Sequence, residues 1–243
     1  MGGLFSHWFK GDIAIDLGTS NTLFFMKDKG ILINEPSVVA ISKRSIKNKG
    51  LVAIGKPAKE MLGRTPAGVE AIRPIKKGVI NDFNATVMML NEFTKQLAIK
   101  RFFTKPRAVI CIPANVSEVE KRAVKESVEF ASDSDVFLVE EPMAAAIGAG
   151  MPITEPAGNM IVDIGGGTTE VAVISLGGIV FAKSIAIGGD NMDEAIQLFV
   201  KNRYSLLIGL STAERIKIRL GNALSVSSDL LEMEVKGIDL VLS

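Results

Sequence analysis

The pattern of apolar and polar positions predicts short buried strands alternating with amphipathic helices. Apolar residues recur at helical spacing over roughly 84–100 and again over 116–130, where the outer face is heavily charged. Further helices are expected at 58–62, 143–149 and 192–204, and from 211 onward, where Ser211-Thr212-Ala213-Glu214 forms a capping-box sequence. The predicted strands are 13–15, 23–26, 37–41, 52–54, 108–112, 136–139, 160–162 and 171–174. Mixed strands and helices of this kind indicate an α/β fold.

One unit of this pattern occurs twice. Residues 13–23 read IAIDLGTSNTL, and residues 160–170 read MIVDIGGGTTE. When the two segments are aligned, Asp16 matches Asp163 and Gly18 matches Gly165. Each copy is an apolar strand, an aspartate, a turn of small residues and a second strand. The chain is therefore expected to contain the same α/β unit twice.

The chemistry of the repeated turn suits a nucleotide. Backbone N–H groups and hydroxyls of a tight Gly/Thr turn point into one cavity, where they bind phosphate oxygens, and glycine lets the backbone approach closely. The phosphate-site residues expected here are Gly18, Thr19, Ser20, Asn21, Gly165, Gly166, Gly167 and Thr168. Asp16 and Asp163 would supply oxygens to a hydrated Mg²⁺. A single Gly-Gly-Gly-Thr is usually only a turn, but two facing hairpins predict a clamp around a polyphosphate.

Composition narrows the range of functions. The 243 residues are 47% hydrophobic with a net charge of +1, which indicates a globular protein without a general affinity for nucleic acid. One histidine and one cysteine exclude His/Cys metal sites and Cys–His catalysis. Cys111 lies in an apolar strand and is expected to be buried and inert. Because no disulfide can form within the chain, a reducing cytoplasm is expected.

Several segments resemble the MreB family of bacterial actins, within the superfamily of actins, DnaK-type chaperones and sugar kinases. These segments are 15–23, 34–39, 140–148, 162–175, 188–196 and 212–217, and the match extends from about Asp12 to the last turn. The resemblance implies an actin-like (ribonuclease H-like) ATPase fold with two related lobes, each a mixed sheet with flanking helices. The first lobe would span 12–150, with a small subdomain inserted at about 34–77, and the second lobe would span 151–243.

The resemblance also implies a function. Proteins of this family are ATP-dependent, membrane-associated filaments in the cytoplasm that organise cell-wall synthesis and maintain rod shape with other rod-complex proteins. By resemblance, Glu141 and Thr168 hold the attacking water beside ATP and Mg²⁺, although Glu141 also suits the N-terminus of the helix that Pro142 starts. The expected adenosine contacts are Glu214, Arg215, Ile216 and Lys217. Glu214 is equally well explained as the acid of the capping box.

Two segments indicate contact with the inner membrane. Residues 1–11 contain apolar side chains that share one helical face, namely Leu4, Phe5, Trp8 and Phe9. A second segment places Phe102 and Phe103 among basic residues, where aromatic rings enter an anionic bilayer while the cations meet its headgroups. The alternatives are a disordered tail for the first segment and packing against the sheet for the second.

The carboxyl end departs from the family pattern. In the family, the chain continues past the region around 237–240 and returns to the second lobe with a Gly-rich segment against the adenosine, and nothing after Leu210 resembles that segment. The second lobe is therefore expected to be incomplete, truncated within its smaller subdomain. Two alternatives to a filament protein remain: a non-catalytic remnant that co-assembles with an intact homologue, or another ATPase of the superfamily. No peptide-binding domain or kinase acid/base group is recognisable.

Overall fold

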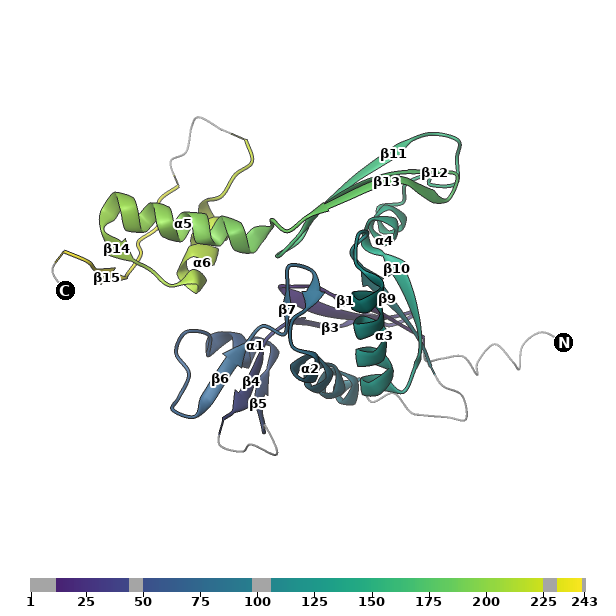
Figure 1. Ribbon diagram of the computed structural model, residues 1–243. Helices are drawn as coiled ribbons and strands as arrows, with labels where there is room; N and C mark the ends of the chain where they lie inside the picture. The colour runs from purple at the N-terminus through teal and green to yellow at the C-terminus, as the bar shows by residue number, and fades with distance from the viewer. Residues whose placement is uncertain (1–11, 44–49, 98–105, 225–230, 242–243) are drawn as a thin grey trace. The chain divides into compact units, whose positions relative to one another are not determined.

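A five-stranded mixed sheet organises the first part of the chain in the computed structural model, which describes residues 12–43, 50–97, 106–224 and 231–241 (Figure 1). Its strand order is β10-β9-β1-β2-β3. The strands are β1 (Ile13–Leu17), β2 (Asn21–Met26), β3 (Gly30–Pro36), β9 (Arg107–Ile112) and β10 (Asp135–Glu140). The first three strands pair antiparallel, whereas β9 is parallel to both β1 and β10. Polar groups at the carboxyl ends of β1, β9 and β10 therefore meet at one edge.

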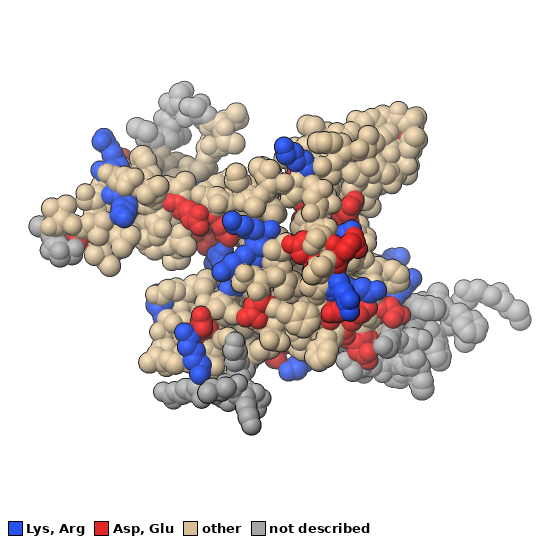
Figure 2. All heavy atoms as spheres, in the orientation of Figure 1, with Lys and Arg blue, Asp and Glu red and all other residues tan. Residues whose placement is uncertain are grey.

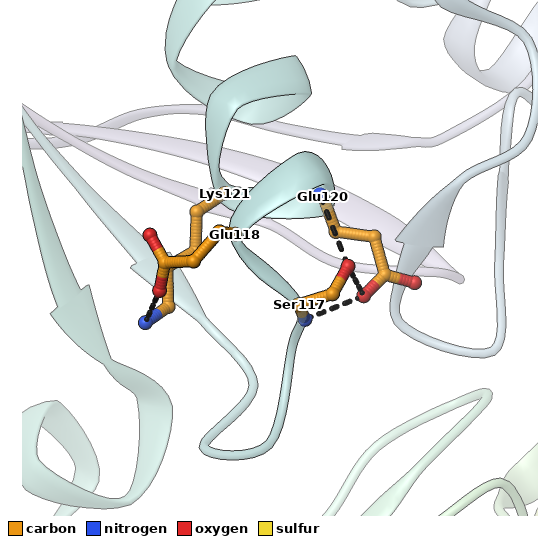
Figure 3. A network of polar contacts seen from close by, with 4 residues as sticks. All are labelled: Ser117, Glu118, Glu120 and Lys121. Atoms are coloured by element: carbon orange, nitrogen blue, oxygen red, sulfur yellow. Dashed lines mark hydrogen bonds and ion pairs between the residues drawn. The ribbon is translucent and has the colours of Figure 1, made fainter.

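The main core lies between this sheet and two helices, α2 (Phe83–Gln96) and α3 (Glu118–Ser132). Alternate residues of β1 are buried, as a strand with one face on the core requires. Phe24 of β2 packs edge-to-face on Phe93 of α2, with ring centroids 6.1 Å apart. Ser117 and Glu120 start α3 with reciprocal hydrogen bonds, Glu120 N–H to Ser117 Oγ and Ser117 N–H to the Glu120 carboxylate (Figure 3).

A small antiparallel sheet, ordered β5-β4-β6, follows β3. Its strands are β4 (Val39–Ser42), β5 (Leu51–Ile54) and β6 (Val69–Ile72), and helix α1 (Gly55–Glu60) packs beside them around buried Val38, Ala40 and Ala58. The chain then forms a two-stranded hairpin of β7 (Ile75–Lys76) and β8 (Val79–Ile80) before α2. This hairpin becomes part of the site described below.

The second copy of the repeat forms an antiparallel sheet, ordered β11-β12-β13. Its strands are β11 (Asn159–Ile164), β12 (Thr169–Ser175) and β13 (Gly178–Ile185). Helix α4 (Glu141–Gly148) directly follows β10 and packs on β11 and β12, where Ala172 and Ile174 are buried. The opposite face of the sheet exposes Met160, Val162 and Ile164.

The chain divides into two compact units, Met1–Ala186 and Ile187–Ser243. The second unit contains α5 (Gly189–Tyr204), β14 (Leu206–Leu207), α6 (Leu210–Leu220) and β15 (Ile238–Asp239). Its core is formed by Val200, Ile208 and Ala213. The lobes expected at 12–150 and 151–243, with an insertion at 34–77, stay a prediction. No helix in the described part of the chain is long and apolar enough to cross a membrane.

Most of the expected helices and strands are confirmed, with shifted ends. Helix α4 begins at Glu141 rather than 143, and α5 begins at Gly189 rather than 192. The capping box expected at 211–214 is wrong, because α6 already begins at Leu210 and its N-cap, Gly209, has no side chain to accept a hydrogen bond. Sequence patterning missed β3, β6, β7, β8, β13, β14 and β15. In β3 both Ile31 and Leu32 are exposed, so the usual alternation of a half-buried strand is lost.

Candidate functional site

The two repeated hairpins open onto one pocket of about 370 Å³ within the first unit. Every residue that the sequence predicted for the phosphate, metal and water sites lines this pocket. These residues are Asp16, Gly18, Thr19, Ser20, Asn21, Glu141, Asp163, Gly165, Gly166, Gly167 and Thr168. Residues separated by about 150 positions therefore meet in one place, as the doubled motif required.

The two hairpin loops are the same length. Leu17 pairs with Thr22 in the first hairpin, and Ile164 pairs with Thr169 in the second, so four residues make each turn. In the second loop the Gly165 N–H donates to the Thr168 carbonyl at 2.8 Å. In the first loop a Cβ atom on Gly18 would lie 2.7 Å from the Asn21 carbonyl oxygen, so the turn requires glycine there.

The second loop also lies directly against the first. A Cβ atom on Gly167 would come within 2.6 Å of Thr19 Oγ1, closer than real side chains approach. The glycines of this loop were expected to make room for phosphate. The structure shows that they also make room for the neighbouring loop.

The buried side chain of Ser37 holds the first loop through hydrogen bonds. Ser37, which follows β3, donates from Oγ to the Gly18 carbonyl at 2.7 Å and lies 2.8 Å from Thr22 Oγ1. Both hydroxyl-bearing residues are fully buried. Because buried polar groups are costly unless paired, this network favours one conformation of the loop. The sequence indicated this buried network only weakly, through a serine directly before the apolar run Val38–Ile41.

A third hairpin completes the rim of the site. The two-residue turn between β7 and β8 is Lys77-Gly78, and the Gly78 N–H donates to Thr19 Oγ1 at 2.9 Å. A Cβ atom on Gly167 would lie 3.0 Å from Lys77 Cα, so this turn contacts both phosphate loops. Strands of two residues have no measurable periodicity, and sequence reasoning missed this hairpin for that reason.

Four carboxyl groups face the pocket. Burial, followed by the negative charges of Glu170, Asp16 and Asp163, raises the pKa of Glu141 to about 8. Enclosure in the pocket, followed by the charge of Asp163, raises the pKa of Asp16. None of the described residues that line the pocket is a lysine, arginine or histidine. The pocket is therefore strongly electronegative and suits a bound cation.

Glu170 is the member of this group that sequence reasoning missed. Its side chain is buried on β12, beside the strand partner Asp163, and its oxygens accept the Ala114 N–H at 3.3 and 3.4 Å. Burial is the main cause of its raised pKa. The sequence could have indicated Glu170, because it lies on the same face of β12 as Ala172 and Ile174, where a charged side chain is unexpected.

The donor set fits Mg²⁺ held mainly through water and phosphate. Within the described residues, no three or more His, Cys, Asp or Glu side chains are arranged to hold a metal ion by themselves. Mg²⁺ keeps several water ligands and commonly uses one or two protein carboxylates, which Asp16 and Asp163 would provide. Cys111 also lines the pocket and is only partly buried, unlike the expectation. Burial raises the pKa of its thiol to about 12, so it is protonated and inert as expected.

The expected adenosine contacts lie on α6 in the second unit. Lys217 donates to the Gly189 carbonyl at 2.8 Å, and its Nζ lies 2.8 Å from Oδ1 of the buried Asp193 in an ion pair. Ile216 packs against the small core of this unit, and Arg215 is exposed. Lys217 thus connects α6 to the start of α5. The expected membrane residues Leu4, Phe5, Trp8, Phe9, Phe102 and Phe103 lie outside the described residues.

Comparison with known proteins adds an independent line of evidence. The family model of the MreB/Mbl protein matches residues 10–243. The chain is 52% identical over 235 residues to the cell shape-determining protein MreB of Escherichia coli K12, covering 96% of this chain and 67% of that protein. It is 49% identical over 233 residues to the cell shape-determining protein Mbl of Bacillus cereus, covering 96% and 69% of the two chains.

Solved structures agree with the sequence relatives. MreB5 of Spiroplasma citri bound to ADP matches with a TM-score of 0.87 and 33% identity, over 96% of this chain and 69% of that one. The same protein bound to AMPPNP gives the same TM-score. The fold is therefore the actin-like α/β fold that the family resemblance implied, and the chain belongs to the MreB/Mbl family of actin-like cell shape-determining proteins.

Proposed function

We propose that this chain binds ATP with Mg²⁺ in the pocket between its two hairpins and takes part in a membrane-associated, actin-like filament that maintains rod shape. The observation that carries the proposal is the meeting of both hairpin loops and four carboxyl groups in one pocket. The nucleotide-bound MreB5 structures support it, because that protein shares the fold and one third of the aligned sequence.

Each loop has a role in this proposal. The backbone amides of 18–21 and 165–168 bind the phosphate oxygens, and Asp16 and Asp163 would hold a hydrated Mg²⁺ beside them. Mg²⁺, when bound, supplies positive charge that offsets the phosphates and the acidic pocket. Glu141 and Thr168 orient the attacking water, with Glu141 accepting its hydrogen bond at the start of α4. Glu214, Arg215, Ile216 and Lys217 contact the adenosine.

Hydrolysis by this scheme requires Glu141 to be ionised. A pKa of about 8 leaves the carboxyl mostly protonated at neutral pH, and a protonated carboxyl cannot accept a proton from water. Because Asp16 and Asp163 contribute to that raised pKa, a cation beside them favours the ionised form of Glu141. The acidic pocket thus couples metal binding to the ionisation of Glu141, the form that accepts a proton from water.

Filament assembly and membrane contact complete the proposal. Self-assembly would give many weak membrane contacts a high combined avidity, through the segments around Trp8 and Phe102. The partners would be further copies of the chain, the inner membrane and cell-wall synthesis proteins. Among the described residues on the face drawn in Figure 2, acidic and basic side chains are interspersed and form no basic stripe of the kind typical of nucleic-acid binding.

Isothermal titration of this chain with ATP and Mg²⁺ tests the central claim. A saturable heat of binding is expected, and Glu141→Gln should keep that binding while it abolishes phosphate release. The control is Glu155→Gln, the same change at an exposed glutamate of the same unit. No binding heat at millimolar ATP would overturn the proposal and favour the non-catalytic remnant, and equal phosphate release by Glu141→Gln would overturn the role of Glu141.

A further inference from the structure

The residues that line the pocket carry negative charges without a compensating cationic side chain among the described lining residues. Four carboxyl groups line the pocket. A polyphosphate would add further negative charge, and one Mg²⁺ contributes only two positive charges. Like charges in a partly enclosed site repel strongly, so a cation from just outside the wall would stabilise the bound anion.

Lys77 is placed to supply that cation. It lies at the tip of the β7–β8 hairpin, whose next residue donates its N–H to Thr19 Oγ1 at 2.9 Å. A Cβ atom on Gly167 would be 3.0 Å from Lys77 Cα, so the Lys77 backbone is in contact range of the second phosphate loop as well. A four-carbon stem therefore starts at the junction of the two loops.

The backbone of Lys77 is also unusual. Lys77 and Gly78 have φ values of 52° and 76°, which is the pattern of a type I′ turn. Such turns favour asparagine, aspartate or glycine at the first position, because other side chains are strained in the left-handed region. Strain of this kind is typical of functional sites. A lysine here is thus not explained by the turn itself.

The Lys77 side chain is available for a ligand. It is exposed and forms no hydrogen bond or ion pair with any other described residue. We propose that Lys77 binds the phosphate group held by both hairpin loops, its ammonium entering the pocket when a polyphosphate is present. This inference rests on the proposed function and adds a phosphate ligand that neither hairpin motif contains.

The test compares variants of the full chain by titration with Mg·ATP and Mg·AMP. Lys77→Gly relieves the strained turn and removes the cation, so the fold should be retained. ATP affinity should fall about tenfold or more, because hydrogen bonds between a cation and phosphate are among the stronger ones. AMP affinity should change less than about twofold, because AMP lacks the polyphosphate. Lys77→Arg should keep most of the ATP affinity.

The matched control is Lys76→Gln, which removes the same charge from the preceding, exposed residue. Unchanged ATP affinity in Lys77→Gly, or equal losses in the Lys76 and Lys77 variants, would overturn the inference. A second experiment with inorganic tripolyphosphate and Mg²⁺ distinguishes a failure of the Lys77 inference from a failure of the proposed nucleotide function. If tripolyphosphate raises the melting temperature of the unsubstituted chain but not of Lys77→Gly, while ATP does not bind, the nucleotide proposal fails and the role of Lys77 stands. If tripolyphosphate protects neither protein, Lys77 has no such role.

Discussion

Gly166 lies directly against Ser20, so that a Cβ atom on Gly166 would be only 2.7 Å from Ser20 Cβ. The two residues belong to the second and first hairpins, which are about 150 positions apart in the chain. Their contact holds the two phosphate loops at a fixed separation. The width of the site therefore depends on the absence of a single methyl group.

Gly166→Ala should force the loops apart. We expect a loss of about 1–3 kcal/mol in the free energy of unfolding, as for other overpacked sites, and at least tenfold weaker ATP binding. Denaturant unfolding and ATP titration measure the two effects. Gly148→Ala is the matched control, because a Cβ atom there meets nothing within 4 Å. Ser20→Gly combined with Gly166→Ala should restore stability relative to Gly166→Ala alone, and an additive double-mutant cycle would contradict the contact.

The stability of the ligand-free chain should depend on the protonation of Glu141. The pKa of Glu141 is about 8 in the folded chain, and its ordinary value of 4.5 applies to the unfolded chain. Between pH 4.5 and about 8 the folded state therefore holds a proton that the unfolded state has lost. The contribution of Glu141 is complete below pH 4.5 and is lost as the pH rises through about 8. Stability should fall by at most about 1.4 kcal/mol per pH unit from this group.

Denaturant unfolding between pH 5 and 8.5 measures this slope in the unsubstituted chain and in Glu141→Gln. The variant should have the flatter profile, because glutamine does not titrate. Added Mg²⁺ should flatten the profile of the unsubstituted chain as well. Identical slopes in the two proteins would show that Glu141 titrates near its ordinary pKa.

Glu170 should have two separable roles. Glu170→Ala removes the acceptor of the Ala114 N–H and should cost about 1–3 kcal/mol of stability, as other unsatisfied buried donors do. Glu170→Gln retains an acceptor oxygen but removes the charge, which is the largest charge effect on the pKa of Glu141. This variant should move the pH profile of stability to lower pH without a large loss. Glu155→Ala, at an exposed site, should be nearly neutral.

Lys217 should be needed for the fold of the second unit. Its ion pair with Asp193 is largely buried, with side-chain exposures of 25% and 8%. A double-mutant cycle of Asp193→Asn and Lys217→Gln should give a coupling of about 1–3 kcal/mol, because removing one partner leaves the other charge buried. A coupling near zero would mean that the pair contributes no stability.

The membrane segments can be tested by co-sedimentation with anionic liposomes. Replacing Trp8 and Phe9 with serine should weaken liposome binding, since two of the three aromatic side chains on the expected helical face are lost. Filament formation in solution, measured by light scattering, should be unchanged. Binding that persists at full strength would leave Phe102 and Phe103 as the expected anchor, and their replacement by serine is the complementary experiment.

The sequence alone was sufficient for the local parts of the site. Each hairpin loop is encoded within eleven consecutive residues, where strand periodicity, an aspartate and a small-residue turn follow one another. Local hydrogen bonding and steric freedom determine such turns, so their pattern can be recognised without tertiary contacts. Both loops could therefore be predicted from the residues themselves, and the family resemblance that they contributed to pointed to Glu141.

Tertiary structure alone decided which further residues join these loops. Lys77 and Gly78 lie in a hairpin whose two-residue strands carry no periodic signal, and the contacts with Thr19 and Gly167 place it at the pocket. Glu170 reads as a strand residue until its burial and its bond to Ala114 are seen. Periodicity reports only which side of an element faces the core. Which distant elements share a site depends on packing between segments far apart in the chain.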